Sequence, residues 1–136
     1  PCNLYSEHDH SEGDKAHFLS SLIHKIQTAT QSNAPTIELF GTGAPLRQFM
    51  YAGDLAEAIK LTLDKKEWFN YNVCTPENIA LEACGATHLT VKWDTGKPDG
   101  QFRKDACSNK FLKDFPEFKF TRLLEGIKKT YNPISK

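Results

Sequence analysis

A histidine, two cations and a carboxylate are the side chains most able to do chemistry in this 136-residue chain. His17 sits near the start of a predicted amphipathic helix, and backbone N–H groups at a helix start favour an anion over a charged histidine. It is therefore either a general acid/base tuned near neutrality or a histidine at a helix start without chemistry. Arg47 is either a surface arginine or, with Lys25, a phosphate clamp, because guanidinium binds phosphate bidentately. Asp99, in the turn 97–100, could accept a hydrogen bond from a sugar hydroxyl or a base edge.

Two further patterns suggest a cofactor loop or a metal site. Gly41-Thr42-Gly43 is part of a dinucleotide fingerprint, but that fingerprint needs three glycines that open a helix. Because Pro45 and a β-like segment follow, the pattern predicts a hairpin turn. Possible metal ligands near the start of the chain are Cys2, His8, Asp9, His10 and His17. Their spacing matches no structural zinc site, so we expect a solvated polar loop and no metal.

Strands and helices that alternate along the chain must position these side chains, which predicts a mixed α/β lobe. We expect a loop over residues 1–10 and then a helix from Asp14 to about Thr30, whose apolar residues fall at helical spacing. The segments that read as strands are 36–40, 46–51, 68–73 and 89–93.

Capping signals mark three further helices. Asp54 with Glu57 forms a capping box that opens a helix through Leu63. Ser108 and Thr121 are plausible N-caps for two more helices in the last quarter of the chain.

The stretch after Pro76 breaks this alternation. Residues 76–79 start a helix, yet Gly85 ends it after two turns, and a helix that short is marginal unless neighbours hold it. We therefore expect residues to be missing between Ile79 and Ala80. The chain also begins at Pro1 without an initiator methionine, so we expect it to be part of a longer protein.

The composition excludes several classes of protein. Lys plus Arg and Asp plus Glu number 17 each, so no net field recruits nucleic acid or an acidic membrane. With 39% hydrophobic and 11% aromatic residues the chain is not disordered, and no apolar run reaches the ~18 residues of a membrane span. The four cysteines form no C-x-x-C pair, which predicts free thiols in the cytoplasm: Cys2, Cys74, Cys84 and Cys107.

Two sequence blocks, G-T-G-A-P-L-R-Q-F at residues 41–49 and K-P-D-G at residues 97–100, stand beside His17 and residues 22–25. Taken in order, these and other segments resemble the C-terminal part of the GDP-L-fucose synthases. These are GDP-4-keto-6-deoxy-D-mannose 3,5-epimerase/4-reductases of the extended short-chain dehydrogenase/reductase superfamily. The resemblance covers nearly the whole chain, and its two most specific blocks together are G-T-G-x-P-x-R-[QE]-F and K-P-D-G. The matching stretches include Pro1–Tyr5, His8-Asp9, His17, residues 22–25, 40–49, 51–56, 71–73 and 94–104.

The resemblance implies a role for each matching residue. Pro1, Cys2, Asn3 and Leu4 would follow a Rossmann strand and lie against the nicotinamide of NADP. His17 would act as acid/base in the epimerisation and would also lie near the cofactor. Residues that would contact the GDP-sugar are Lys25, Phe40, Arg47 and Asp99. The fold implied is the substrate-binding portion of a Rossmann-like α/β enzyme, with residues 1–136 forming a single lobe.

Much of the machinery of such an enzyme is absent from this sequence. It contains no Gly-x-x-Gly-x-x-Gly loop and no Tyr-x-x-x-Lys pair. We therefore expect the chain alone to be inactive as a reductase, and its parent to be an NADP-dependent homodimer. The alternatives are a lobe that binds nucleotide sugars without chemistry, a structural remnant, or a metal-binding module around His8, His10 and His17.

Overall fold

The computed structural model describes residues 1–13, 16–75, 79–80 and 89–131, and its internal contacts define two compact units. Unit 1 comprises Pro1–His8, Gln48–Asn78 and Asp105–Lys136. Unit 2 comprises Asp9–Arg47 and Ile79–Lys104. The single lobe over residues 1–136 stays a prediction.

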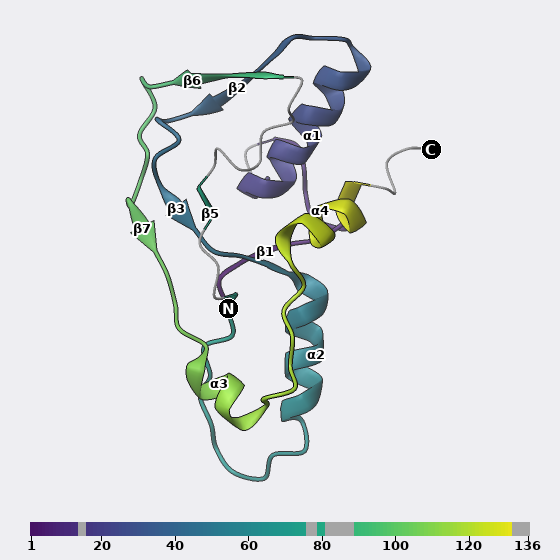
Figure 1. The fold of residues 1–136 in the computed structure, drawn as a ribbon, viewed down its shortest axis with the longest axis vertical. Helices are drawn as coiled ribbons and strands as arrows, with labels where there is room; N and C mark the ends of the chain where they lie inside the picture. Colours follow the sequence, from purple (N-terminus) through teal and green to yellow (C-terminus); the bar gives the residue numbers. More distant parts are fainter. Residues whose placement is uncertain (14–15, 76–78, 81–88, 132–136) are drawn as a thin grey trace. The chain divides into compact units, whose positions relative to one another are not determined.

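Unit 2 is built on a helix packed beside two parallel strands (Figure 1). The strands β2 (Thr36–Phe40) and β6 (Thr90–Asp94) pair in register from Thr36 opposite Thr90 to Phe40 opposite Asp94. Helix α1 (Phe18–Gln31) buries Leu19, Leu22 and Ile23, and β2 buries its alternate residues Ile37 and Leu39. The sequence predictions of this helix and both strands are confirmed, with β6 shifted by one residue. Asp14, the predicted cap of α1, lies outside the described residues.

The predicted hairpin after β2 is wrong. The strand β3 (Leu46–Arg47) pairs with β5 (Ile79–Ala80) and β7 (Arg103–Lys104), not with β2. The turn itself has the expected backbone, because Gly41 and Gly43 adopt φ values of 83° and 80°. Two glycines and a proline thus redirect the chain into another sheet instead of folding it back on its own strand.

The predicted strand 46–51 is two strands that belong to different units. Unit 1 starts with β1 (Asn3–Tyr5), which pairs in parallel with β4 (Phe49–Tyr51). Between β3 and β4, the Gln48 side chain is buried and binds the backbone of Ala106 through both its nitrogen and its oxygen, at 3.1 and 2.8 Å. This side-chain pairing interrupts the ladder. The prediction of a loop over residues 1–10 is also wrong in part, because the strand β1 lies inside that range.

Three helices complete unit 1. Helix α2 (Ala52–Thr62) and helix α4 (Leu123–Tyr131) both contact β4, and α3 (Asn109–Asp114) starts after Ser108 as predicted. The capping predictions at Asp54 and Thr121 are wrong. Asp54 lies inside the first turn of α2, where its carboxylate accepts hydrogen bonds from the backbone N–H and the hydroxyl of Thr121, at 2.7 and 2.6 Å.

The predicted strand 68–73 has no strand geometry in the structure. Its aromatic residues instead face different surroundings: Trp68 is fully exposed, whereas Tyr71 packs edge-on against Phe111 at 5.7 Å. Phe111 is fully buried and also contacts Phe115 and Phe118, each at 5.0 Å between ring centroids. Tyr71, which is a β-forming residue by type, therefore packs into an aromatic cluster, and this packing requires no hydrogen-bonded pairing with another strand.

The stretch after Pro76 contains the strand β5 (Ile79–Ala80) where a helix is predicted, so the prediction is wrong at those two residues. The remainder of that prediction, residues 76–78 and 81–88, lies outside the described residues. Whether residues are missing between Ile79 and Ala80 stays a prediction.

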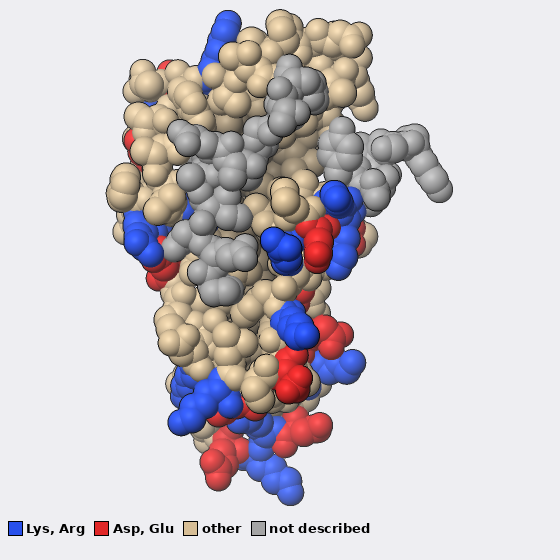
Figure 2. Space-filling view, viewed as in Figure 1, with Lys and Arg blue, Asp and Glu red and all other residues tan. Residues whose placement is uncertain are grey.

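The surface charges are mixed. Figure 2 shows acidic and basic side chains interspersed on the displayed face, most densely over α2 and α3, with no large area of one sign. This agrees with the equal numbers of acidic and basic residues. In the part of the chain that the structure describes, no helix is both long and apolar enough to cross a bilayer.

Candidate functional site

The turn after β2 binds the carboxylate of Asp99, which comes from a distant part of the chain. Its two oxygens accept hydrogen bonds from the backbone N–H of Thr42 at 2.6 Å and from the Thr42 hydroxyl at 2.7 Å. These bonds, with the charge of Arg47, hold the pKa of Asp99 below its ordinary value. A side chain at Gly41 would overlap this carboxylate, so the glycine is what allows Asp99 to approach the turn.

An aromatic ring with two lysines lies beside this turn. Phe40 ends β2 and is 60% exposed, which is unusual for a large apolar side chain. The ammonium groups of Lys25 and Lys97 lie 5.3 and 5.6 Å from the centre of its ring, within the range of cation–π attraction. Lys25 also donates to the carbonyl of Glu38 at 2.8 Å. This arrangement fixes two positive charges on one exposed ring.

Arg47 is the positive charge that lies near Asp99. Its Nη1 donates to the carbonyl of Leu46 at 2.8 Å, and its Nη2 lies 3.7 Å from the position a Gly100 side chain would take. Because Gly100 follows Asp99 directly, the guanidinium and the carboxylate are near neighbours. The structure therefore brings four predicted residues into one continuous group within unit 2: Lys25, Phe40, Asp99 and Arg47.

His17 lies apart from that group in its contacts. It is the residue immediately before α1, whereas the sequence predicts a helix that already starts at Asp14, and Lys25 lies eight residues on, about 12 Å along the axis. The His17 Nδ1 lies 3.0 and 3.1 Å from the two carboxylate oxygens of Asp9. Its side chain is 70% exposed. No sequence motif pairs these two residues, and the contact joins positions eight apart.

The four residues predicted to touch NADP form the start of unit 1. Asn3 and Leu4 belong to β1, and the Asn3 amide donates to the carbonyl of Gln48 at 2.9 Å. Pro1 and Asn3 are exposed, while Cys2 and Leu4 are half-buried. An extended, partly apolar edge of this kind can flank a planar ring.

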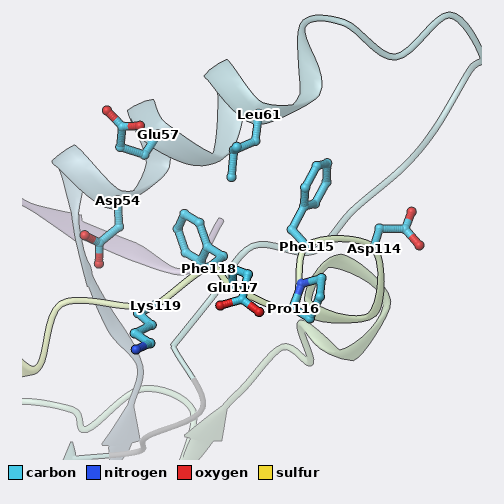
Figure 3. Close-up of a pocket in the computed structure, with 9 residues that line it drawn as sticks. All are labelled: Asp54, Glu57, Leu61, Asp114, Phe115, Pro116, Glu117, Phe118 and Lys119. Carbon is cyan, nitrogen blue, oxygen red and sulfur yellow. The ribbon is translucent and has the colours of Figure 1, made fainter.

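The cavity in Figure 3 is distinct from all these residues. It has a volume of about 500 Å³ and lies within unit 1, between α2 and residues 114–119. Leu61, Phe115 and Phe118 face the space, whereas the Asp114 carboxylate points away from it (Figure 3). None of the predicted catalytic, cofactor-binding or substrate-binding residues lines this cavity.

The remaining sequence hypotheses concern a dinucleotide fingerprint, a metal site and the cysteines. Gly41 and Gly43 open no helix, because β3 follows them, so a dinucleotide fingerprint is excluded there. In the described ranges, no group of three or more His, Cys, Asp and Glu side chains is arranged to hold a metal ion. Cys2, Cys74 and Cys107 are free thiols, and Cys84 lies outside the described residues.

Sequence reasoning missed the partners that hold the predicted residues in place. Thr42 anchors Asp99, and Asp9 contacts His17. Lys97 shares the Phe40 ring with Lys25. Lys97 stands two residues before Asp99 in the K-P-D-G block, and Thr42 lies between the two glycines, so both were within recognised motifs.

Comparisons with known proteins show what this chain is similar to. The family model described as "NAD dependent epimerase/dehydratase family" matches residues 1–74. A GDP-L-fucose synthase of Dictyostelium discoideum is 31% identical over 96% of this chain and 43% of its own length. A crystal structure of a GDP-L-fucose synthetase from Naegleria fowleri matches with a TM-score of 0.84 at 32% identity, again over 96% of this chain and 43% of that one.

A second structure of the Naegleria fowleri protein, bound to NADP, matches with a TM-score of 0.80 and covers 95% of this chain. The chain thus spans less than half the length of the relatives it matches. These likenesses confirm the resemblance to GDP-L-fucose synthases and the α/β fold, a portion of the extended short-chain dehydrogenase/reductase fold. Since the family match covers 74 of 136 residues, the chain belongs to the NAD dependent epimerase/dehydratase family.

Proposed function

We propose that this chain is the substrate-side lobe of an NADPH-dependent enzyme that makes GDP-L-fucose. Its parent would carry out 3,5-epimerisation and 4-reduction of GDP-4-keto-6-deoxy-D-mannose. The observation that carries the proposal is the group in unit 2: Lys25 lies over the exposed Phe40 ring, and Thr42, two residues after Phe40 in the chain, binds Asp99, whose carboxylate also experiences the charge of Arg47. The similarity to proteins named GDP-L-fucose synthase supports the choice of a guanosine-diphosphate sugar.

Each member of the group suits one part of such a ligand. The exposed Phe40 ring offers a flat apolar surface, and the Arg47 guanidinium is suited to the diphosphate because it binds phosphate oxygens bidentately. Lys25 adds a second positive charge beside the ring. Asp99 remains ionised at neutral pH, and its oxygens keep acceptor capacity beyond the two Thr42 bonds, so it can accept from a sugar hydroxyl or a base edge.

The chemistry assigned to His17 follows from the substrate. The ketone at C4 acidifies the C–H bonds at C3 and C5, because the resulting enolate places charge on oxygen. Inverting a carbon centre then needs a base on one face and an acid on the other. His17 is exposed enough to reach a bound sugar, and an imidazole exchanges protons near neutral pH. We assign it one of these two roles.

The start of unit 1 would flank the cofactor. Its half-buried and exposed residues, with Asn3 tied to Gln48, can hold one side of a nicotinamide ring: Pro1, Cys2, Asn3 and Leu4. NADPH supplies the hydride for reduction at C4 when it is bound. The glycine-rich loop and the Tyr-x-x-x-Lys pair are not in this sequence, so we propose that the chain by itself binds the nucleotide sugar but does not reduce it.

Calorimetry of the 136-residue chain with GDP and with guanosine tests the proposal. We expect GDP to bind and the Arg47→Ala variant to bind it at least about tenfold more weakly, because a charge-assisted contact contributes about 1.5–3 kcal/mol. Guanosine, which has no phosphate, should bind both proteins equally. The matched control is Arg122→Ala, which removes an exposed arginine of unit 1. Absence of GDP binding by the unaltered chain would contradict the proposal and favour a structural remnant.

A further inference from the structure

The carboxylate of Asp9 is held between two residues at the start of α1. Ser20 donates its hydroxyl proton to Asp9 Oδ2 at 2.6 Å, and the backbone N–H of His10 donates to Oδ1 at 2.9 Å. The His17 Nδ1 reaches both oxygens, at 3.0 and 3.1 Å. Ser20 is buried, and the Asp9 side chain is only 15% exposed. The carboxylate therefore has a fixed position set by the helix and its own loop.

Asp9 is an ionised acceptor in this position. Partial burial raises the pKa of its carboxyl, but the hydrogen bonds from Ser20 and His17, the charge of His17 and the His10 N–H together lower it below the ordinary value. An ionised carboxylate has acceptors only, so a neutral imidazole that bonds to it must carry its proton on Nδ1. In the described part of the chain, every hydrogen bond and ion pair of the His17 ring runs through Nδ1.

Among the residues that the structure describes, the opposite nitrogen of the His17 ring then has no hydrogen-bond partner. With the proton on Nδ1, the Nε2 atom carries a lone pair, and the largely exposed ring presents it away from the carboxylate. A base that removes a proton from carbon needs that lone pair at a defined place. A histidine without such a partner populates both tautomers and several ring orientations.

We propose that Asp9 is a positioning residue for His17: it holds the imidazole with Nδ1 protonated and directs Nε2 outward as the proton-exchanging atom. Ser20 supports this role by fixing the second carboxylate oxygen. The assignment rests on the proposed function of His17 in epimerisation, but the tautomer itself is a property of the chain that needs no substrate.

Nitrogen-15 NMR of the histidine side chains tests the inference directly, at a pH well above the ordinary histidine pKa of about 6.5. The His17 signals are identified by their loss in His17→Gln. We expect the unaltered chain to show mainly the Nδ1–H tautomer. Asp9→Ala should return the ring to mainly Nε2–H, the form that an imidazole without a partner favours. Ser20→Ala should give a smaller shift in the same direction.

Two further variants separate positioning from a change in folding. Asp9→Asn keeps the size of the side chain, and because its amide both donates and accepts, we expect a mixture of tautomers. Glu12→Ala removes the carboxylate that lies 3.4 Å from His24 Nε2 and should leave the His17 signals unchanged. An Nε2–H tautomer in the unaltered chain would overturn the inference, and so would an unchanged tautomer in Asp9→Ala with retained far-ultraviolet circular dichroism.

The outcome is independent of the GDP test. If the tautomer responds as expected while GDP fails to bind, the positioning contact stands and the proposed function falls. If GDP binds and Arg47→Ala weakens it, but His17 lacks the Nδ1 proton, the function stands and Asp9 has no positioning role.

Discussion

Polar side chains have different roles in unit 1 and in unit 2. In unit 1 the polar contacts join elements far apart in the sequence, as Asp54 does with Thr121 and Gln48 with Ala106. In unit 2 the carboxylates Asp9 and Asp99 are also anchored, by Ser20 and by Thr42, but the groups beside them stay exposed. A polar group whose partners are all internal stabilises the fold. An anchored carboxylate beside an exposed ring or imidazole leaves room for a ligand.

Replacing Phe111 should have the largest effect on stability. The ring is fully buried in unit 1 and contacts Tyr71, Phe115 and Phe118. Phe111→Ala should lower the free energy of unfolding by about 3–5 kcal/mol, through lost burial and the cavity left behind. Urea denaturation measures it. The control is Phe102→Ala, in unit 2, whose ring is 67% exposed, and for which we expect a small change.

This variant also tests the single-lobe prediction. If residues 1–136 unfold as one lobe, circular dichroism and tryptophan fluorescence should give coincident transitions in Phe111→Ala, both shifted to lower urea. Two separated transitions, with only one of them shifted, would show that the units unfold independently and would contradict the prediction of a single lobe.

Removing the Asp54 charge should have an intermediate effect. Its carboxylate is buried and accepts two hydrogen bonds from Thr121, and an amide would place a donor against one of those donors. Asp54→Asn should therefore lower the free energy of unfolding by about 1.5–3 kcal/mol, measured by urea denaturation.

Glu57→Gln is the matched control for that variant. Glu57 lies on the same helix, but its side chain is 64% exposed and pairs with Lys60 at 3.6 Å, so we expect a change within about 0.5 kcal/mol. Equal losses in the two variants would refute the assignment of Asp54 as a structural contact.

The smallest effect is expected at Asp99, and it should depend on pH. The Thr42 bonds and Arg47 depress the pKa of the folded-state carboxyl below its ordinary value of 3.8. Its stabilisation is therefore present above that value and is lost as the pH falls through the folded-state pKa. Asp99→Asn should be less stable than the unaltered chain at neutral pH, and the difference should vanish on acidification.

A series of urea denaturations across this pH range measures the difference. Thr42→Ala, which removes the hydroxyl donor, should reduce it, and the double variant should show no additional loss from that hydrogen bond. A difference between Asp99→Asn and the unaltered chain that persists below the folded-state pKa would contradict the role given to ionisation.

Local signals were sufficient where an element follows from its own residues. The alternation in 36–40 and the apolar spacing of α1 gave β2 and most of that helix, because both patterns report one buried face. The predictions failed where tertiary partners decide. Asp54 reads as a cap from its neighbours, but Thr121, far along the chain, takes its carboxylate. Gln48 ends a strand only because Ala106 lies within its reach.

The sequence names candidate site residues, whose roles stay predictions, but it does not give their geometry. The motif blocks named Lys25, Phe40, Arg47 and Asp99, and the structure groups them. The contact between Asp9 and His17 could not be found from spacing, because eight residues of loop separate them and no helical or strand period relates them. Such contacts depend on how a loop returns to a helix, which the sequence pattern alone does not encode.

The two left-handed glycines of the turn have a practical consequence for redesign. Any side chain at Gly43 would overlap the Trp93 ring, and one at Gly41 would overlap the Asp99 carboxylate. A library aimed at altering ligand preference should therefore keep both glycines fixed and vary Lys25, Phe40 and Lys97. These residues supply the exposed Phe40 ring and the two ammonium groups over it, and none of them belongs to the bend at residues 41–45.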